Sequence, residues 1–190
     1  MRSDKIQEEF SLDIKTIEHF ETYAEVLLHW NKTHNLSGIN SVNEVYTNIY
    51  DSIYPLKFIQ DFASCIDIGS GSGFPALPLA ICKPECEFIL VEPRLKRASF
   101  LKNLIIELGL KGIDVQKCLI EDLEFHKKVD LITSRAVMQS KELIKNSKRF
   151  LKKNGHYLFY KGEHLESEID ALENECFYRE KRIYFYRKEI

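Results

Sequence analysis

Residues 65–78 read CIDIGSGSGFPALP, and this stretch decides the fold. An apolar run over residues 65–68 predicts a short buried strand, which is followed by glycines at the alternate positions Gly69, Gly71 and Gly73. Glycine lets the backbone adopt a positive φ and approach a ligand closely, because it has no Cβ. Residues 76–82 then predict a short apolar helix. A strand, a glycine-rich turn and a helix in this order predict a nucleotide-type binding site at the carboxyl end of a parallel sheet.

The glycine turn departs from the two common phosphate-binding motifs. The dinucleotide fingerprint requires a third glycine where Phe74 stands, and the absence of Lys-Ser/Thr after the glycines excludes a P-loop. The acidic residue Asp67 precedes the turn. This pattern better suits a cofactor without a pyrophosphate, such as S-adenosylmethionine, whose amino-acid moiety could lie against the turn. The alternative is a tight turn without a ligand.

A second acidic residue strengthens the cofactor interpretation. Residues 88–91 predict another buried strand, and Glu92 follows it near the ~20-residue spacing expected for a carboxylate that binds ribose hydroxyls. Charge-assisted hydrogen bonds of this kind contribute roughly 1.5–3 kcal/mol each. The alternative is an exposed loop glutamate that pairs with Arg94.

Length and composition predict one folded domain. The chain has 190 residues, 44% hydrophobic content and a formal net charge of −2, which are ordinary values for a globular protein. We expect residues 1–60 to form a helical cap and residues 61–190 to form a cofactor-binding α/β core. We also expect a cytoplasmic protein without membrane contact, because there is no signal-peptide core and no apolar stretch near the ~20 residues that span a bilayer. A monomer is the default expectation. The net charge excludes a globally basic nucleic-acid binder but allows a local basic patch.

Cysteine and histidine patterns do not indicate a metal site. The five cysteines are scattered, and no second Cys/His pair accompanies Cys82 and Cys86. The six histidines form no HExxH or paired-ligand pattern. We therefore expect reduced thiols and no metal.

Hydrophobic periodicity predicts alternating strands and helices after two initial helices. The initial helices are expected over residues 14–30 and 42–59, with Ser11 or Asp13 as a cap. Further helices are expected over residues 95–108, 140–151 and 165–172, and further strands around Val115 and over residues 129–133, 155–160 and 182–186. This alternation predicts a doubly wound, mostly parallel sheet.

In such a sheet, functional side chains gather at the carboxyl ends of the strands. The predicted strand ends place Arg135 and Lys161 at the same edge as the glycine turn, which indicates an anionic or electron-rich substrate. The alternative for Arg135 is an ion pair with Asp67 or Asp51. A lysine-rich run over residues 141–153 is either a solvated helix face or a phosphate-tracking surface.

An ordered set of motifs resembles the RsmG family, also called GidB. The set begins with Trp30-Asn31-Lys32, Asn35-Leu36 and Asp51-Ser52 and continues with the DIGSGSGFP turn over residues 67–75. It ends with Lys96-Arg97, Phe100-Leu101, Glu121, Ser134-Arg135-Ala136 and Lys161-Gly162. The resemblance covers the chain from about Tyr23 to its end.

The resemblance implies a function, a fold and site residues. It implies methylation of N7 of one guanine in 16S ribosomal RNA near the decoding site, within the small subunit or a precursor, with S-adenosylmethionine as methyl donor. It implies the class I (Rossmann-like) methyltransferase fold, with a reversed last strand and an N-terminal helical cap. Cofactor binding is implied for Asp67, Gly69, Ser70, Gly71, Gly73, Phe74, Glu92, Ile120, Glu121 and Arg135. RNA binding is implied for Lys32, Asn35, Arg94, Lys96, Arg97 and Lys161, and a place at the reaction centre for Arg135 and Lys161.

This chain departs from the family pattern at three sequence positions and in its C-terminal hairpin, which looks short. Thr47-Asn48 stand where the family commonly has Arg-His, Ala76 stands where glycine is usual, and Leu119 stands where an arginine is frequent. The two lost basic positions leave the detailed RNA contacts open.

The chemistry of guanine N7 is consistent with this set of residues. N7 has an in-plane lone pair and no proton, so its attack on a sulfonium methyl needs no general base, and the rate would depend on alignment. Because the product purine is cationic, we hypothesise that Arg135 holds a phosphate or guanine O6 rather than N7. Three alternatives stay open: a small-molecule methyltransferase, a NAD-dependent oxidoreductase, which Phe74 disfavours, and a regulatory module that binds the cofactor without turnover.

Overall fold

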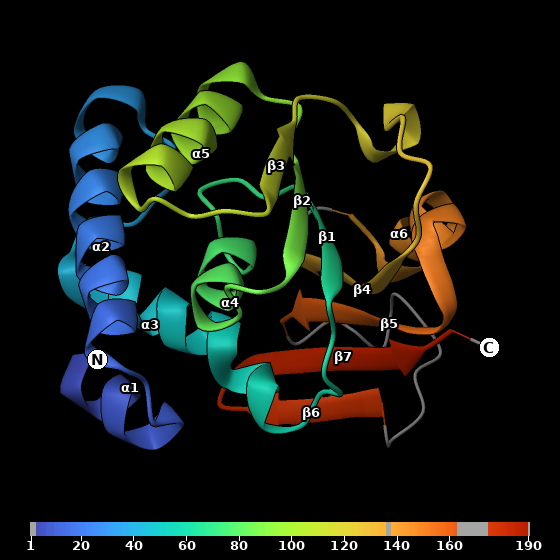
Figure 1. Cartoon of the computed structure of the whole chain (residues 1–190), viewed down its shortest axis with the longest axis horizontal. Helices are drawn as coiled ribbons and strands as arrows, with labels where there is room; N and C mark the ends of the chain where they lie inside the picture. The colour runs from blue at the N-terminus through green and yellow to red at the C-terminus, as the bar shows by residue number, and fades with distance from the viewer. Residues whose placement is uncertain (1–2, 136–137, 163–174, 190) are drawn as a thin grey trace.

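One sheet of seven strands, in the order β3-β2-β1-β4-β5-β7-β6, runs through the computed structural model, which describes residues 3–135, 138–162 and 175–189 (Figure 1). The strands are β1 (Ser64–Ile68), β2 (Glu87–Val91), β3 (Ile113–Gln116), β4 (Val129–Arg135), β5 (Leu151–Lys161), β6 (Cys176–Arg179) and β7 (Arg182–Lys188). The first five strands pair in parallel, β7 is antiparallel to β5, and β6 is antiparallel to β7. The predicted mostly parallel sheet with a reversed last strand is confirmed.

Helices cover both faces of the sheet, so the predicted double winding is also confirmed. They are α1 (Ser3–Phe10), α2 (Ile14–His34), α3 (Val42–Ile53), α4 (Ala76–Cys82), α5 (Leu95–Glu107) and α6 (Ser140–Ser147), with short 3-10 turns at Tyr54–Lys57, Ile120–Asp122 and Lys148–Phe150. In Figure 1, α2 to α5 lie to the left of the sheet and α6 lies to the right. No helix among the described residues is long and apolar enough to cross a bilayer.

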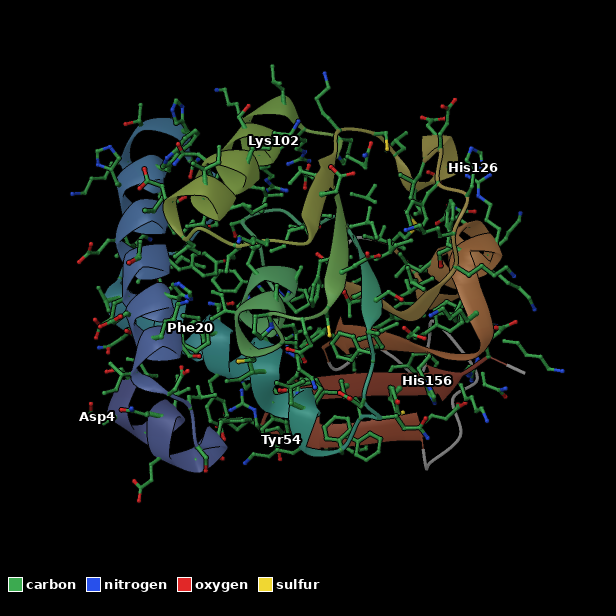
Figure 2. The ribbon with its side chains drawn as sticks, in the orientation of Figure 1. Asp4, Phe20, Tyr54, Lys102, His126 and His156 are labelled. Carbon is green, nitrogen blue, oxygen red and sulfur yellow. The ribbon has the colours of Figure 1, made fainter. Side chains whose placement is uncertain are left out.

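Because side chains along each strand alternate between the two faces of the sheet, the apolar core is divided into one cluster on each face. On β2, Phe88 and Leu90 belong to the cluster under the N-terminal helices, whereas Ile89 and Val91 belong to the cluster under α6. Successive strand side chains point to opposite faces, and a sheet covered on both sides therefore needs continuous apolar runs. Phe20, labelled in Figure 2 on the inner side of α2, is fully buried in the first cluster.

Local capping explains where α2 begins and ends. The Asp13 side chain accepts a hydrogen bond from the Thr16 amide at 2.8 Å, which confirms the predicted cap at Asp13. The helix continues past the predicted end at Trp30 as far as His34, because Asn35 adopts the left-handed conformation (φ 47°) that ends a helix.

Two other helical predictions need correction. The α1 helix was not predicted, and α3 ends at Ile53, because Pro55 has no N–H to continue an α-helix.

The segment 140–151 does not form the single helix that was predicted. The α6 helix ends at Ser147, and β5 begins at Leu151, which pairs with Val129 of β4. Lys152 and Lys153 therefore lie near the amino end of β5, whereas the glycine turn lies at the carboxyl ends of the parallel strands. Lys152 pairs with Asp130 at 2.8 Å. The lysine run is thus divided among α6, the 3-10 turn at Lys148–Phe150 and β5, so it does not form one helix face. The β6 strand was not predicted, and the helix predicted over residues 165–172 lies outside the described residues.

The order of the strands places a topological switch point between β1 and β4. From β1 the chain proceeds to β2 and β3 on one side, and β4 and β5 follow on the other side. Ile68, the last residue of β1, is in register with Val91 of β2 and Ser134 of β4. Open α/β sheets bind ligands outside the carboxyl ends of the strands at such a point. The glycine turn, Glu92 and Arg135 all follow or end these three strands.

Candidate functional site

A cavity of about 420 Å³ opens at the switch point. We call it the glycine pocket. Its walls come from the glycine turn, the β2–α5 connection, the end of β4 and the loop after α2. The lining residues are Leu36, Ser37, Gly69, Ser70, Gly71, Ser72, Phe74, Glu92, Pro93, Arg94, Arg97 and Arg135.

The glycine turn is fixed by backbone hydrogen bonds and by close packing. The amides of Gly69 and Ser70 both donate to the Val91 carbonyl at the end of β2, at 2.8 and 3.2 Å. At Gly73 (φ 97°) an added Cβ would lie 2.6 Å from the Tyr23 hydroxyl, so this position lacks space for a side chain. At Gly71 (φ 57°) the nearest atoms to such a Cβ would be 3.7 and 4.0 Å away. Backbone at Gly71 is therefore accessible from the pocket, as close approach of a ligand requires.

Glu92 organises the turn with both of its carboxylate oxygens. Oε2 accepts from the Gly71 amide at 2.8 Å, and Oε1 accepts from the Arg94 amide at 2.9 Å. The residue is only 2% exposed. The alternative of an exposed loop glutamate is therefore wrong, and its contact with Arg94 goes through the backbone.

Asp67 lies beneath the turn in an almost fully buried position. Its Oδ1 accepts from the Thr133 hydroxyl at 2.7 Å, while Oδ2 has no hydrogen-bond partner among the described residues. Burial raises the pKa of Asp67 to about 6 from an ordinary 3.8, and the hydrogen bond from Thr133 opposes the shift. Asp67 is only 1% exposed and does not line the glycine pocket, so its assignment to the cofactor stays a prediction.

Arg135 ends β4 beside the pocket, within a stack of side chains. Its guanidinium carbon lies 5.0 Å from the centre of the Phe74 ring, and Tyr23 stacks on Phe74 with the ring centres 5.0 Å apart. Nη1 of Arg135 donates to the Asn48 side chain at 2.8 Å and lies 3.7 Å from Oδ2 of Asp51. Burial lowers the pKa of Arg135, and the charge of Asp51 opposes this shift. The predicted ion pair with Asp51 is present, and the same side chain lines the pocket.

Lys161 lies at the same edge of the sheet but does not line the pocket. It follows Tyr160, which is in register with Arg135. Its side chain is buried, and Nζ donates to the Met138 carbonyl at 2.9 Å in the segment after β4. Lys161 therefore contacts the connection that follows Arg135.

The structure does not bring Ile120 and Glu121 into the pocket. Ile120 is buried in the cluster under α6, and Glu121 is exposed, with Oε1 accepting from the Asn146 side chain. Their assignment to the cofactor stays a prediction.

The model of the GidB family, described as rRNA small subunit methyltransferase G, matches residues 16–189. The chain belongs to the GidB family. It is 52% identical to Ribosomal RNA small subunit methyltransferase G of Helicobacter hepaticus over 173 residues, which cover 90% of this chain and 94% of that protein. It is 54% identical to the Helicobacter pylori protein of the same name over 169 residues, which cover 89% and 95% of the two chains.

Solved structures show the same fold at low identity. A 16S rRNA methyltransferase of T. thermophilus in complex with AdoMet and guanosine aligns with a TM-score of 0.60 and 14% identity, covering 81% of this chain and 44% of that chain. A ribosomal protein L11 methylase of Lactobacillus delbrueckii subsp. bulgaricus aligns with a TM-score of 0.56 and 17% identity, covering 74% and 77%. The fold of the GidB chain is thus that of class I methyltransferases.

The basic residues that the GidB resemblance assigns to RNA differ in position. Arg94 and Arg97 line the glycine pocket, and Lys96 is exposed on the same first turn of α5. Lys32 and Asn35 are exposed at the end of α2. Asn35 caps that helix, which gives it a structural role in addition to any contact with RNA.

Four residues near the site had not been assigned to it from the sequence. The Tyr23 hydroxyl donates to the Ser72 carbonyl at 2.6 Å and so ties α2 to the glycine turn. Asn31 holds the loop after α2 through hydrogen bonds to Ser37 and to the Ile39 carbonyl. The Asp51-Ser52 pair is one of the GidB motifs, and this signal could have led to Asp51. Nothing in the sequence pattern pointed to Tyr23 or to Asn48, which stands where the family commonly has histidine.

No metal centre is evident in the part of the chain that the structure describes. Among these residues, no group of three or more His, Cys, Asp and Glu side chains is placed to hold an ion. His126 and His156, both labelled in Figure 2, belong to the segment before β4 and to β5.

Proposed function

We propose that this chain transfers a methyl group from S-adenosylmethionine to N7 of one guanine in 16S ribosomal RNA, near the decoding site. One observation carries the proposal: a chain of the GidB family has a glycine pocket in which accessible backbone and the Glu92 carboxylate meet the partly buried Arg135. The target position within the RNA comes from the family resemblance.

The residues of the glycine pocket fit S-adenosylmethionine. Each Glu92 oxygen accepts one amide and keeps a second lone pair that can accept from a ribose hydroxyl. The backbone at Gly71 is accessible to the amino-acid moiety. When bound, the cofactor supplies an electrophilic methyl group on a sulfonium centre.

The lack of a free general base in the described pocket lining favours a nucleophile without a proton. Among the described lining residues the only carboxylate is Glu92, and two backbone amides already donate to it. Guanine N7 needs no general base, whereas an exocyclic amine must lose a proton during methylation. Positioning of the base is then the main source of catalysis, and it can contribute roughly 7–11 kcal/mol.

Arg135 and Lys161 have positioning roles in this proposal. Arg135 lies against Phe74 and is held by Asn48 and Asp51, so its guanidinium has a fixed place in the pocket wall. From that wall it can donate to a phosphate or to guanine O6. Lys161 supports the segment after Arg135 through the Met138 carbonyl.

The basic first turn of α5 supports RNA as the substrate. Arg94 is the N-cap residue of α5, and Lys96 and Arg97 follow it. Cations at a helix N-terminus oppose the helix dipole, which costs typically 0.3–1 kcal/mol each. A phosphate backbone beside the pocket would compensate this cost, whereas a small neutral substrate would not.

Methyl transfer to ribosomal particles tests the proposal. Small subunits from cells that lack this protein are incubated with the chain and methyl-labelled S-adenosylmethionine, and the modified base is mapped. We expect label at N7 of a single guanine near the decoding site. Cofactor binding without labelled RNA would refute the RNA substrate, and a modified exocyclic amine would refute the N7 assignment.

A further inference from the structure

A second cavity, of about 240 Å³, lies between α3 and the hairpin of β6 and β7. We call it the arginine pocket. It is lined by Asn48, Asp51, Arg179, Glu180, Lys181 and Arg182, together with Thr47. Its volume is several times the ~30 Å³ that one water occupies in the liquid, so it has room for a small polar group.

Asp51 gathers three arginines at the base of this pocket. Its Oδ1 accepts from Nε of Arg182 at 3.1 Å, from Nη2 of Arg179 at 3.4 Å and from the Tyr184 hydroxyl at 2.9 Å. Its Oδ2 lies 3.0 Å from Nη2 of Arg182 and 3.7 Å from Nη1 of Arg135. Asp51 is only 4% exposed, so these contacts are made away from bulk water.

Positive charge is in excess around this carboxylate. The cations are Arg135, Arg179, Arg182 and Lys181, while the carboxylates are Asp51 and Glu180, the second of which lies 3.8 Å from Arg179. Lys181 is exposed and makes no ion pair among the described residues. One arginine would suffice to anchor the hairpin to Asp51, and crowding like charges at a partly buried site is unfavourable. The excess therefore indicates an external anion.

The two hairpin arginines also have more donors than the described acceptors use. A guanidinium carries five N–H groups. Arg182 contacts Asp51 through Nε and Nη2 and the Lys161 carbonyl through Nη1. Arg179 contacts the Tyr184 hydroxyl, Asp51 and Glu180. Each arginine thus retains N–H capacity for an oxyanion, which arginine binds in a bidentate manner.

The arginine pocket adjoins the glycine pocket through a shared wall. Asn48 and Asp51 line the arginine pocket, and both contact Arg135, which lines the glycine pocket. A polymer with one nucleotide beside Arg135 would therefore have its backbone within reach of the β6–β7 hairpin.

We propose that the arginine pocket binds a phosphodiester group of the RNA strand whose base meets the cofactor beside Arg135. This inference rests on the proposed function, because it assumes an RNA substrate. It assigns to Arg179, Lys181 and Arg182 a contact that holds the strand, while Asp51 orients the arginines.

Lys181→Glu and Arg179→Gln test the arginine pocket, with Lys153→Glu as the matched control. Lys181 is exposed, so its replacement should not disturb folding, and Lys153 is exposed at the opposite edge of the sheet. The KM for small subunits lacking the modification, its dependence on salt, and the Kd for S-adenosylmethionine are measured for each variant. We expect Lys181→Glu and Arg179→Gln to raise the KM about tenfold and to reduce the salt slope by about 1. Cofactor affinity should not change, and Lys153→Glu should behave as the wild type.

The outcomes separate the two proposals. An equal rise in KM for Lys181→Glu and Lys153→Glu would show that overall charge causes the effect, and the proposed contact at the arginine pocket would be refuted. If both pocket variants keep the wild-type KM and salt slope, the arginine pocket does not bind the RNA, although the proposed function can still hold. If the wild-type chain labels no RNA, the proposed function fails first. The Kd for a labelled 16S rRNA fragment then tests the arginine pocket separately. If the wild type and both pocket variants bind the fragment with equal affinity, the proposal for the arginine pocket is wrong.

Discussion

Glu92 holds the glycine turn with both carboxylate oxygens, so a change in its chemistry should affect the cofactor first. In Glu92→Gln, an NH₂ group replaces one of the acceptors for the Gly71 and Arg94 amides. A lost charge-assisted hydrogen bond costs about 1.5–3 kcal/mol, which corresponds to a Kd for S-adenosylmethionine raised roughly 10- to 100-fold. Isothermal titration calorimetry measures this change. Glu87→Gln is the control, because Glu87 is exposed at the opposite end of the same strand; an equal loss there would contradict a local role for Glu92.

Asp67 makes stability depend on pH in an unusual direction. Burial raises the pKa of Asp67 to about 6 in the folded protein from an ordinary 3.8. Between these values the folded state binds more protons than the unfolded state, so the contribution of Asp67 to the free energy of unfolding falls as pH rises. The total change is roughly 3 kcal/mol, because each pKa unit corresponds to about 1.4 kcal/mol.

Asp67→Asn should remove this dependence. Relative to the wild type, the variant should gain roughly 2–3 kcal/mol in free energy of unfolding between pH 4 and pH 7. Urea unfolding at both pH values measures the difference, and it cancels the constant cost of the new amide. A difference between the two proteins that is the same at both pH values would show that the Asp67 carboxylate ionises normally.

Single residues were predictable from sequence where backbone geometry or strand position determines their role. The three glycines follow a strand directly, and Glu92 follows the next strand, so topology alone places them together. Tyr23 and Asn48 were not predictable in this way. Each lies on a helix far along the chain from its partner, Ser72 or Arg135, and nothing in helical periodicity distinguishes it from neighbouring buried or exposed positions.

The contact between α2 and the glycine turn links the N-terminal helices to the cofactor pocket. In Tyr23→Phe the Ser72 carbonyl loses its 2.6 Å donor while the stack on Phe74 is kept. A buried hydrogen bond of this kind contributes about 1 kcal/mol, so we expect the Kd for S-adenosylmethionine to rise about fivefold and Tm to fall by a few degrees. Calorimetry and thermal unfolding measure the two effects.

Tyr54→Phe is the control for the contact between α2 and the glycine turn. The Tyr54 hydroxyl makes no hydrogen bond within the described ranges, and the residue lies outside the glycine pocket. Its variant should keep wild-type cofactor affinity. If Tyr23→Phe did so too, the helices would cover the turn without helping to hold it.

Whole elements were predictable where one local pattern dominated. The strand, turn and helix over residues 64–82 match the prediction, since continuous apolar runs and glycines allow few other arrangements. The segment 140–151 was mispredicted because its lysines suit a helix, whereas pairing of Leu151 with Val129 draws the end of the segment into the sheet. The β6 strand is short and only partly buried, so it lacks a clear alternating pattern.

The net charge of the molecule conceals a local basic surface beside the glycine pocket. The chain carries −2 overall, yet Arg94 and Arg97 line the pocket that we propose for the reaction. Neutralising phosphates releases counterions, so affinity for RNA falls with salt, by roughly 0.7–0.9 in the log–log slope for each contact. We therefore expect the double variant Arg94→Gln/Arg97→Gln to raise the KM for small subunits and to reduce the salt slope by roughly 1.4–1.8.

A double variant of lysines far from the glycine pocket distinguishes a local effect of Arg94 and Arg97 from the effect of a lower net charge. Lys128 and Lys153 are exposed at the amino ends of β4 and β5, across the sheet from the pocket, so Lys128→Gln/Lys153→Gln changes the net charge equally. At about 0.15 M salt the Debye length is ~8 Å, so charges at that edge should hardly affect RNA at the pocket. Measuring KM from 50 to 300 mM salt compares the two double variants, and equal salt slopes would mean that RNA responds to the whole molecule rather than to the arginines of the first turn of α5.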